Sequence, residues 1–111
     1  MKNQFELIFC TCPDEEMATQ LANGLVSEHL ATCVNILPDI TSIYPWEDKI
    51  ETSTEQLLVI KSQKELYSRI ESYIVKNHPY ELPEIIAVPI RQGLPGYLDW
   101  IKSWTNAKHH E

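Results

Sequence analysis

The chain has few glycines, few basic residues and no long hydrophobic run, and each shortage excludes a class of protein. Three glycines in 111 residues supply neither a Gly-rich phosphate loop nor a Gly-x-Ser-x-Gly nucleophile motif. Nine basic against sixteen acidic residues give a formal charge of −7, which argues against nucleic acid and anionic membranes as partners, because both attract basic surfaces. The longest aliphatic run, Leu57–Ile60, is far shorter than the roughly 20 residues that span a bilayer.

Cysteine is also scarce, and its spacing predicts reduced thiols. Cys10, Cys12 and Cys33 are odd in number and form no Cys-x-x-Cys motif, so neither a thioredoxin-type motif nor a structural zinc site is supported. Residues 1–6 carry one basic residue and no small-residue cleavage site follows them, which is not the pattern of a signal peptide. We therefore expect a cytoplasmic protein.

The apolar pattern predicts a single α+β domain over residues 1–111. Strands alternate with amphipathic helices in the order β-α-β-β-α-β, and a short helix follows. This order is typical of the ferredoxin-like fold, an antiparallel four-stranded sheet with two helices on one face. The expected strands cover residues 5–12, 32–46, 49–61 and 85–88, and the expected helices cover residues 14–30, 62–77 and 97–104.

Local signals predict where these elements begin and end. Pro13 suits the first turn of the first helix, and Ser62 with Glu65 forms a capping box for the second. Residues 38–39, Pro-Asp, interrupt the second strand as a bend or bulge would. Pro89 either ends the last strand or lies on a free edge.

The second and third strands predict a hairpin that is too long for so small a core. At about 3.3 Å per residue, the third strand alone reaches roughly 40 Å, whereas a chain of this length has an expected radius of gyration of about 13 Å. The tip, with its turn at residues 47–48, should therefore protrude, and protruding strands need a cover. Tyr44 and Trp46 near the tip suggest a protein interface; the alternative is that they cap the ends of the monomer core.

The cysteines and histidines could bind a metal, but each has a plainer interpretation. Cys10 and Cys12 point to the same face of a strand and could hold a soft ion such as copper(I). Core packing is the alternative, and we favour it for Cys12 and Cys33. His78 is either a metal ligand or, as we favour, a side chain that caps the carbonyls of the preceding helix.

The remaining candidate side chains carry weaker signals. His29 lies on the apolar helix stripe, where a packed histidine is expected. Residues 105–111, which include His109 and His110, are expected to fray. Four glutamates could pair as acid and base, although a solvated hairpin flank and loop is the favoured interpretation. These are Glu51, Glu55, Glu81 and Glu84.

Four stretches of the chain resemble the CutA divalent-cation tolerance proteins. Residues 41–51, Thr-Ser-Ile-Tyr-Pro-Trp-Glu-Asp-Lys-Ile-Glu, resemble the family signature Ser-x-Tyr-x-Trp-x-Gly-x-Ile/Leu-Glu. Residues 78–86 look like its His-Pro-Tyr-x-x-Pro-Glu segment, residues 31–35 match its Ala-Ala-Cys-x-x stretch, and residues 97–101 match its closing Tyr-Leu-x-Trp-Ile/Leu. The motifs occur in order over nearly the whole chain, so the resemblance is highly specific.

The resemblance implies a PII-like subunit of a tight homotrimer, in a non-enzymatic protein of divalent metal (copper) tolerance or response. In the family, a copper-binding role attaches to a Cys on the first strand and to a His or His-His pair before the Pro-Tyr. The corresponding residues here are Cys10, Asn77 and His78. Asn77 removes one possible imidazole ligand, so we expect weak binding of copper(II) or another divalent cation. Asp48 replaces the usual turn glycine and should keep the turn at a small cost.

The resemblance also implies that the long hairpins pack against neighbouring subunits, with clefts between the subunits. The residues expected at the interface or cleft are Tyr44, Trp46, Glu51, Lys61, Tyr80, Glu84 and Trp100. An alternative function is therefore a PII-like signalling or scaffold trimer that binds a small ligand or partner protein in these clefts. An enzyme is the least favoured hypothesis, because His78 with Glu81 or Glu84 has no evident nucleophile partner.

Overall fold

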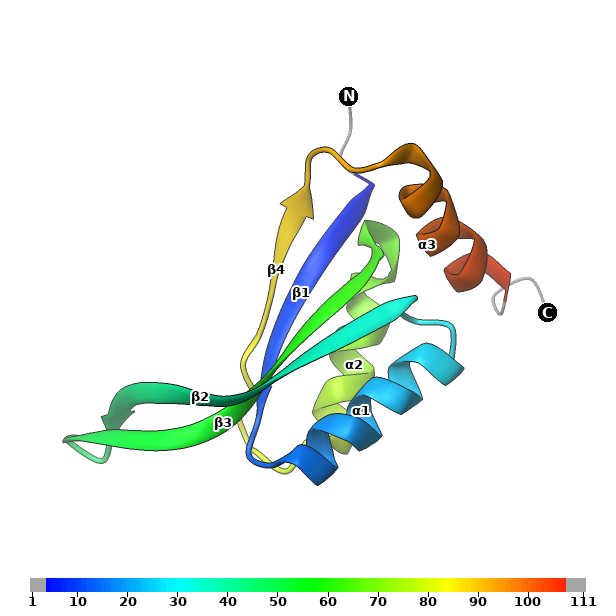
Figure 1. Ribbon diagram of the computed structural model, residues 1–111. Coiled ribbons are helices and arrows are strands. Elements are labelled where there is room, and N and C mark those ends of the chain that lie inside the picture. The colour runs from blue at the N-terminus through cyan, green and yellow to red at the C-terminus, as the bar shows by residue number, and fades with distance from the viewer. Residues whose placement is uncertain (1–3, 108–111) are drawn as a thin grey trace.

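The computed structural model describes residues 4–107 and contains, within that range, the expected order of strands and helices (Figure 1). The strands form one antiparallel sheet in the order β2-β3-β1-β4, which is the ferredoxin-like arrangement. The elements are β1 (Phe5–Cys12), α1 (Glu15–Ser27), β2 (Cys33–Trp46), β3 (Lys49–Gln63), a 3-10 turn (Lys64–Leu66), α2 (Tyr67–Asn77), β4 (Ile85–Ile90) and α3 (Pro95–Ala107).

The core lies between one face of the sheet and the helices α1 and α2, which cover the same side (Figure 1). Ile8, Cys10 and Cys12 alternate along β1 and are fully buried on this face. Each paired residue on a neighbouring strand points to the same face, so Leu58 on β3 packs beside Cys10. β1 is therefore the central strand of the core, and its C-terminal end carries two thiols into it.

The β2–β3 hairpin projects well beyond the body of the molecule (Figure 1). The chain measures 45 Å along its longest axis against 29 and 22 Å along the others. A register shift between Leu37 and Ile40 marks the expected bulge. Trp46 pairs with Lys49 around a two-residue turn in which Glu47 and Asp48 have φ of 48° and 65°. The turn is thus kept without glycine, as expected.

The structure confirms the start of the first helix to within one residue and corrects that of the second. α1 begins at Glu15 and is capped by Asp14, whose carboxylate accepts a hydrogen bond from the Met17 N–H at 2.8 Å, so Pro13 lies just before the cap. Ser62 forms no capping box but stays in β3, fully buried, and its hydroxyl donates to the Leu30 carbonyl at 2.6 Å. A buried hydroxyl needs a partner, and here the partner comes from the loop after α1, so α2 begins through a 3-10 turn instead.

The C-terminal helix is longer and better anchored than expected. Thr105 does not fray: it is fully buried, donates to the Ile101 carbonyl at 2.7 Å and accepts from Gln63 Nε2 at 2.8 Å. His29 lies in the turn after α1, with a φ of 59°, and not on the helix stripe as expected. Its ring is nevertheless packed, because it stacks on that of Trp104 at a centroid distance of 3.8 Å. His109 and His110 lie outside the described residues.

The last strand decides between the two positions that were predicted for Pro89. Pro89 lies within β4, which runs on to Ile90 and pairs only with β1. Proline is tolerated there because the free edge needs no N–H donor. None of the helices in residues 4–107 has the length and apolar character needed to cross a membrane.

Candidate metal site

Three metal-ligating side chains meet where β1 ends and α2 gives way to the following loop. The ligand atoms of Cys10, Cys12 and His78 all lie within 4.8 Å of one another. Both cysteines are fully buried, and His78 is only 8% exposed. Strand alternation places the two thiols on the core face, and the end of α2 delivers the imidazole beside them. Among the described residues, this is the one group of three His, Cys, Asp or Glu side chains whose ligand atoms lie close enough to share a metal ion.

Two backbone groups hold the imidazole of His78. Nε2 lies 2.7 Å from the carbonyl oxygen of Thr11, and Nδ1 lies 3.1 Å from the backbone nitrogen of Tyr80. A carbonyl can only accept, so Nε2 carries the proton and Nδ1 accepts from the Tyr80 N–H. The favoured interpretation of His78 as a helix cap is therefore wrong for the side chain, which tethers the loop after α2 to β1.

The two free thiols interact, and the interaction shifts their pKa values in opposite directions. The hydrogen bond from Cys10 to Cys12, together with burial, raises the pKa of the Cys10 thiol. The same hydrogen bond lowers the pKa of Cys12, against the opposing effect of its burial. The Thr11 carbonyl oxygen, 3.7 Å from Cys10 Sγ, is the alternative acceptor for the single S–H proton of Cys10.

Two carboxylates lie near enough to the thiols to act on them electrostatically. Glu55, expected on a solvated hairpin flank, is only 7% exposed and accepts a hydrogen bond from the Tyr80 hydroxyl at 2.9 Å. Burial and then this hydrogen bond raise the pKa of Tyr80. The negative charges of Glu84 and Glu55 contribute to the raised pKa of Cys10. The surroundings of the group therefore favour a cation over an anion.

Gln56 is a neighbour of this group that sequence reasoning did not identify. It pairs directly with Cys12 across β1 and β3, so its side chain stands on the same face of the sheet. It is 6% exposed, and its Oε1 is buried without a hydrogen-bond partner among the described residues. The signal that could have found it is the strand register, which depends on tertiary pairing.

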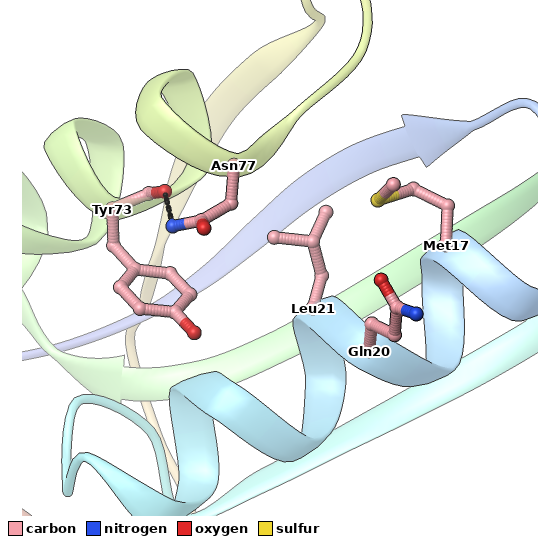
Figure 2. Close-up of a pocket in the computed structure, with 5 residues that line it drawn as sticks. All are labelled: Met17, Gln20, Leu21, Tyr73 and Asn77. Atoms are coloured by element: carbon pink, nitrogen blue, oxygen red, sulfur yellow. Dashed lines mark hydrogen bonds between the residues drawn. The ribbon is translucent and has the colours of Figure 1, made fainter.

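Asn77, the third residue that the resemblance proposed as a ligand, lies outside the group of three. Its side chain is exposed, and Nδ2 donates to the carbonyl of Tyr73 at 2.8 Å. Figure 2 shows it at the end of α2, across from α1. With Tyr73 it lines a small pocket of about 140 Å³ between the two helices, whose other lining residues are Met17, Gln20 and Leu21.

The residues expected at subunit clefts do not form one cleft within a single chain. Tyr44 and Glu51 pair with each other in the outer half of the hairpin. Lys61 lies ten residues further along β3, about 33 Å away along a strand, where its ammonium contacts Asn35 and the thiol of Cys33. Trp100 lies on α3, so only an assembly of several copies could bring these residues together.

The donor set at the end of β1 fits a transition-metal cation. Thiolate and imidazole are ligands of copper, zinc and related ions, whereas magnesium and calcium prefer oxygen. Both thiols would have to lose their protons on binding, and the imidazole already has a carbonyl acceptor for its N–H, which is the usual support of a metal-bound histidine.

The chain is similar to known proteins over most of its length. Residues 6–104 match the family model described as CutA1 divalent ion tolerance protein. The chain is 41% identical to the divalent-cation tolerance protein CutA of Thermus thermophilus over 100 residues, 90% of this chain and 97% of that one. It is 44% identical to protein CutA of Mus musculus over 99 residues, 89% of this chain, but spans only 56% of the mouse protein.

A solved structure shows the same fold. The crystal structure of CutA from Xylella fastidiosa superposes with a TM-score of 0.90 at 43% identity, over 92% of this chain and 98% of that chain. The match in sequence to the Thermus thermophilus protein and the match in structure to the Xylella fastidiosa protein cover 90% and 92% of this chain. The chain therefore belongs to the CutA1 divalent ion tolerance family.

Proposed function

We propose that the protein is a non-enzymatic, cytoplasmic homotrimer of divalent-metal tolerance that binds copper(II)-like cations through Cys10 and His78. The observation that carries the proposal is the approach of their ligand atoms to within 4.8 Å in a buried group. Names of relatives such as the Thermus thermophilus divalent-cation tolerance protein support the tolerance role. Glu55 and Glu84 add negative charge nearby.

The hydrogen bonds of His78 support a non-enzymatic role. A general base needs an accessible ring nitrogen within reach of a substrate proton. Here Nε2 is bonded to the Thr11 carbonyl and Nδ1 to the Tyr80 N–H, and the ring is nearly buried. The imidazole is thus engaged in holding the fold together and is not poised for proton transfer to a substrate.

Exposed apolar side chains on two elements support the trimer. On the hairpin, Ile43, Trp46 and Ile50 are 69%, 60% and 73% exposed. On β4, Ile86 and Val88 are also exposed, and they lie on the sheet face opposite Cys10. Large apolar surface on a protruding hairpin is typical of an interface rather than of a free monomer.

Copper titration of matched variants tests the metal assignment. Calorimetry on wild type, Cys10→Ser and His78→Gln should show weaker copper(II) binding in both variants, by about tenfold or more. Cys33→Ser is the matched control, because Cys33 lies near Lys61 and outside the group. Unchanged copper(II) affinity in folded Cys10→Ser and His78→Gln would rule out these ligands.

A scaffold that binds a small ligand or partner protein is the second candidate, favoured by the exposed aromatic rings of Trp46 and Trp100. A thermal-shift screen separates the two functions. Stabilisation by an organic metabolite and none by copper would favour the scaffold, and the reverse pattern would favour the metal role.

A further inference from the structure

We infer that Cys12 is a metal ligand beside Cys10 and His78, and that this group takes a soft d10 cation, copper(I) before others, in a closed three-ligand site. The inference rests on the proposed function, because it concerns the same site. It goes beyond that proposal by adding a ligand and by changing the class of cation from copper(II)-like to copper(I).

The spacing of the donor atoms fits one ion shared by three ligands. With metal–sulfur bonds of about 2.3 Å, two thiolates on one ion lie about 3.8 Å apart at a tetrahedral angle and about 4.6 Å apart when collinear. The donor atoms of Cys10, Cys12 and His78 all lie within 4.8 Å of one another. The upper bound on these separations is thus only slightly longer than the collinear sulfur–sulfur distance that one ion requires.

Burial restricts which cations this group accepts. Both sulfurs belong to fully buried residues, and His78 is nearly so. Magnesium and calcium need six or more oxygen ligands and usually keep water molecules, for which an enclosed group of two thiols and one imidazole offers no place. Copper(II) prefers a tetragonal set of nitrogen and oxygen ligands, whereas thiolates select copper(I) and other soft ions.

Gln56 is an independent sign that this part of the core is more than packing. A core that only excludes water is built from apolar side chains, and buried polar groups normally find hydrogen-bond partners. Gln56 stands directly across from Cys12 with a buried, unpartnered Oε1. Thiolates formed at Cys10 and Cys12 would accept a hydrogen bond from the amide N–H₂ of this side chain, whose two ends exchange by rotation.

His78 would have to give up one of its two backbone hydrogen bonds to bind the ion. Nε2 is bonded to the Thr11 carbonyl and Nδ1 accepts from the Tyr80 N–H, and a neutral imidazole coordinates through the nitrogen that carries no proton. Occupation of the site should therefore release either the Thr11 carbonyl or the Tyr80 N–H from the ring.

An anaerobic titration with copper(I) against a chromophoric chelator tests the role of Cys12. We expect Cys12→Ala to weaken copper(I) binding by at least about 100-fold, more than the loss of an outer supporting group usually costs. Cys33→Ala should retain the wild-type affinity, since Cys33 lies outside the group. Undiminished copper(I) affinity in Cys12→Ala would overturn the inference.

X-ray absorption on the wild-type protein loaded with copper(I) keeps the test valid if the variant does not fold. Two sulfur neighbours per copper are expected, and a single one would overturn the assignment. The outcome is separable from that of the proposed function. Copper(II) binding that needs Cys10 and His78 but never Cys12 would preserve the proposed function alone, and copper(I) binding without copper(II) binding would preserve only this inference.

Discussion

His78 links two parts of the chain that are 67 positions apart in sequence, through its bond to the Thr11 carbonyl. The ring also accepts from the Tyr80 N–H and lies 4.8 Å from the Tyr80 ring between centroids. A single side chain therefore joins the end of β1 to the loop that leads into β4. This role exists whether or not a cation is bound, and it can be tested without one.

Replacing His78 should destabilise the metal-free protein according to how many hydrogen bonds the new side chain retains. His78→Leu leaves the Thr11 carbonyl and the Tyr80 N–H without this partner, and we expect a loss of about 2–3 kcal/mol in the free energy of unfolding. His78→Gln can still donate to Thr11 and should lose about half as much. Urea denaturation in the presence of a chelator measures both values, and equal stability of the two variants would refute the tether.

The Tyr80–Glu55 pair predicts a loss of stability at alkaline pH. The folded-state pKa of Tyr80 is raised by burial and by its bond to Glu55, so the contribution is fully present below the unfolded-state pKa near 10. It is lost as the pH rises from there toward the folded-state value. Unfolding free energies measured from pH 8 to 11 should fall less steeply in Tyr80→Phe than in wild type. Identical slopes would show that Tyr80 is not the group responsible.

At the scale of elements, the hairpin turn is formed by residues that rarely adopt its geometry. Glu47 and Asp48 both have positive φ, as a two-residue primed turn requires, and glycine or asparagine normally occupies such positions. The aspartate tolerates left-handed geometry better than most residues. The β2–β3 pairing on either side, which continues to Trp46 and Lys49, holds the turn in place.

Asp48→Gly should stabilise the protein by about 0.5–1 kcal/mol, because it removes the left-handed strain of a side-chain-bearing residue. The matched control is Ser53→Gly on β3 of the same hairpin, which should destabilise, since glycine weakens a strand interior. Thermal and urea unfolding give both changes. A destabilised Asp48→Gly protein would mean that the carboxylate makes a contribution larger than the strain.

At the scale of the whole molecule, the elongated shape leaves apolar side chains of the hairpin exposed to solvent. The hairpin projects from the body of the molecule (Figure 1), and exposed Trp46 and Ile50 lie within two residues of its turn. A single subunit would leave this apolar surface in water, and its edges would be open to pairing with other chains. In the proposed trimer the hairpin of one subunit would lie on its neighbours and cover both the apolar surface and the strand edges.

Light scattering should therefore give the mass of three chains. The double variant Ile43→Lys/Ile50→Lys, with two charges on the hairpin, should shift the mass toward one chain, because burying an unpaired charge in an interface is unfavourable. Val75→Lys is the matched control: Val75 is exposed on α2, away from the hairpin, so the mass should not change. A wild-type mass of one chain would contradict the proposed assembly.

Much of the fold could be predicted because it depends on short-range patterns. The apolar and aromatic run of residues 5–12, the helical spacing of Leu66, Ile70 and Ile74, and the bulge signal of residues 38–39 are all local. The structure confirms the strand, the buried helix stripe and the bulge. The predictions for Ser62 as a helix cap and for Thr105 as part of a frayed end were wrong. The hydroxyl groups of both residues have hydrogen-bond partners in distant parts of the chain, which local sequence does not reveal.

The sequence by itself determined the element order, the family, the protruding hairpin and the shared face of Cys10 and Cys12, since each follows from spacing along the chain. Only the tertiary structure decided that Cys12 joins Cys10 and His78 in one group, that Glu55 is buried, and that Gln56 stands opposite Cys12. The physical reason is that strand register and helix packing bring together residues more than forty positions apart, and no local pattern records which of them will meet.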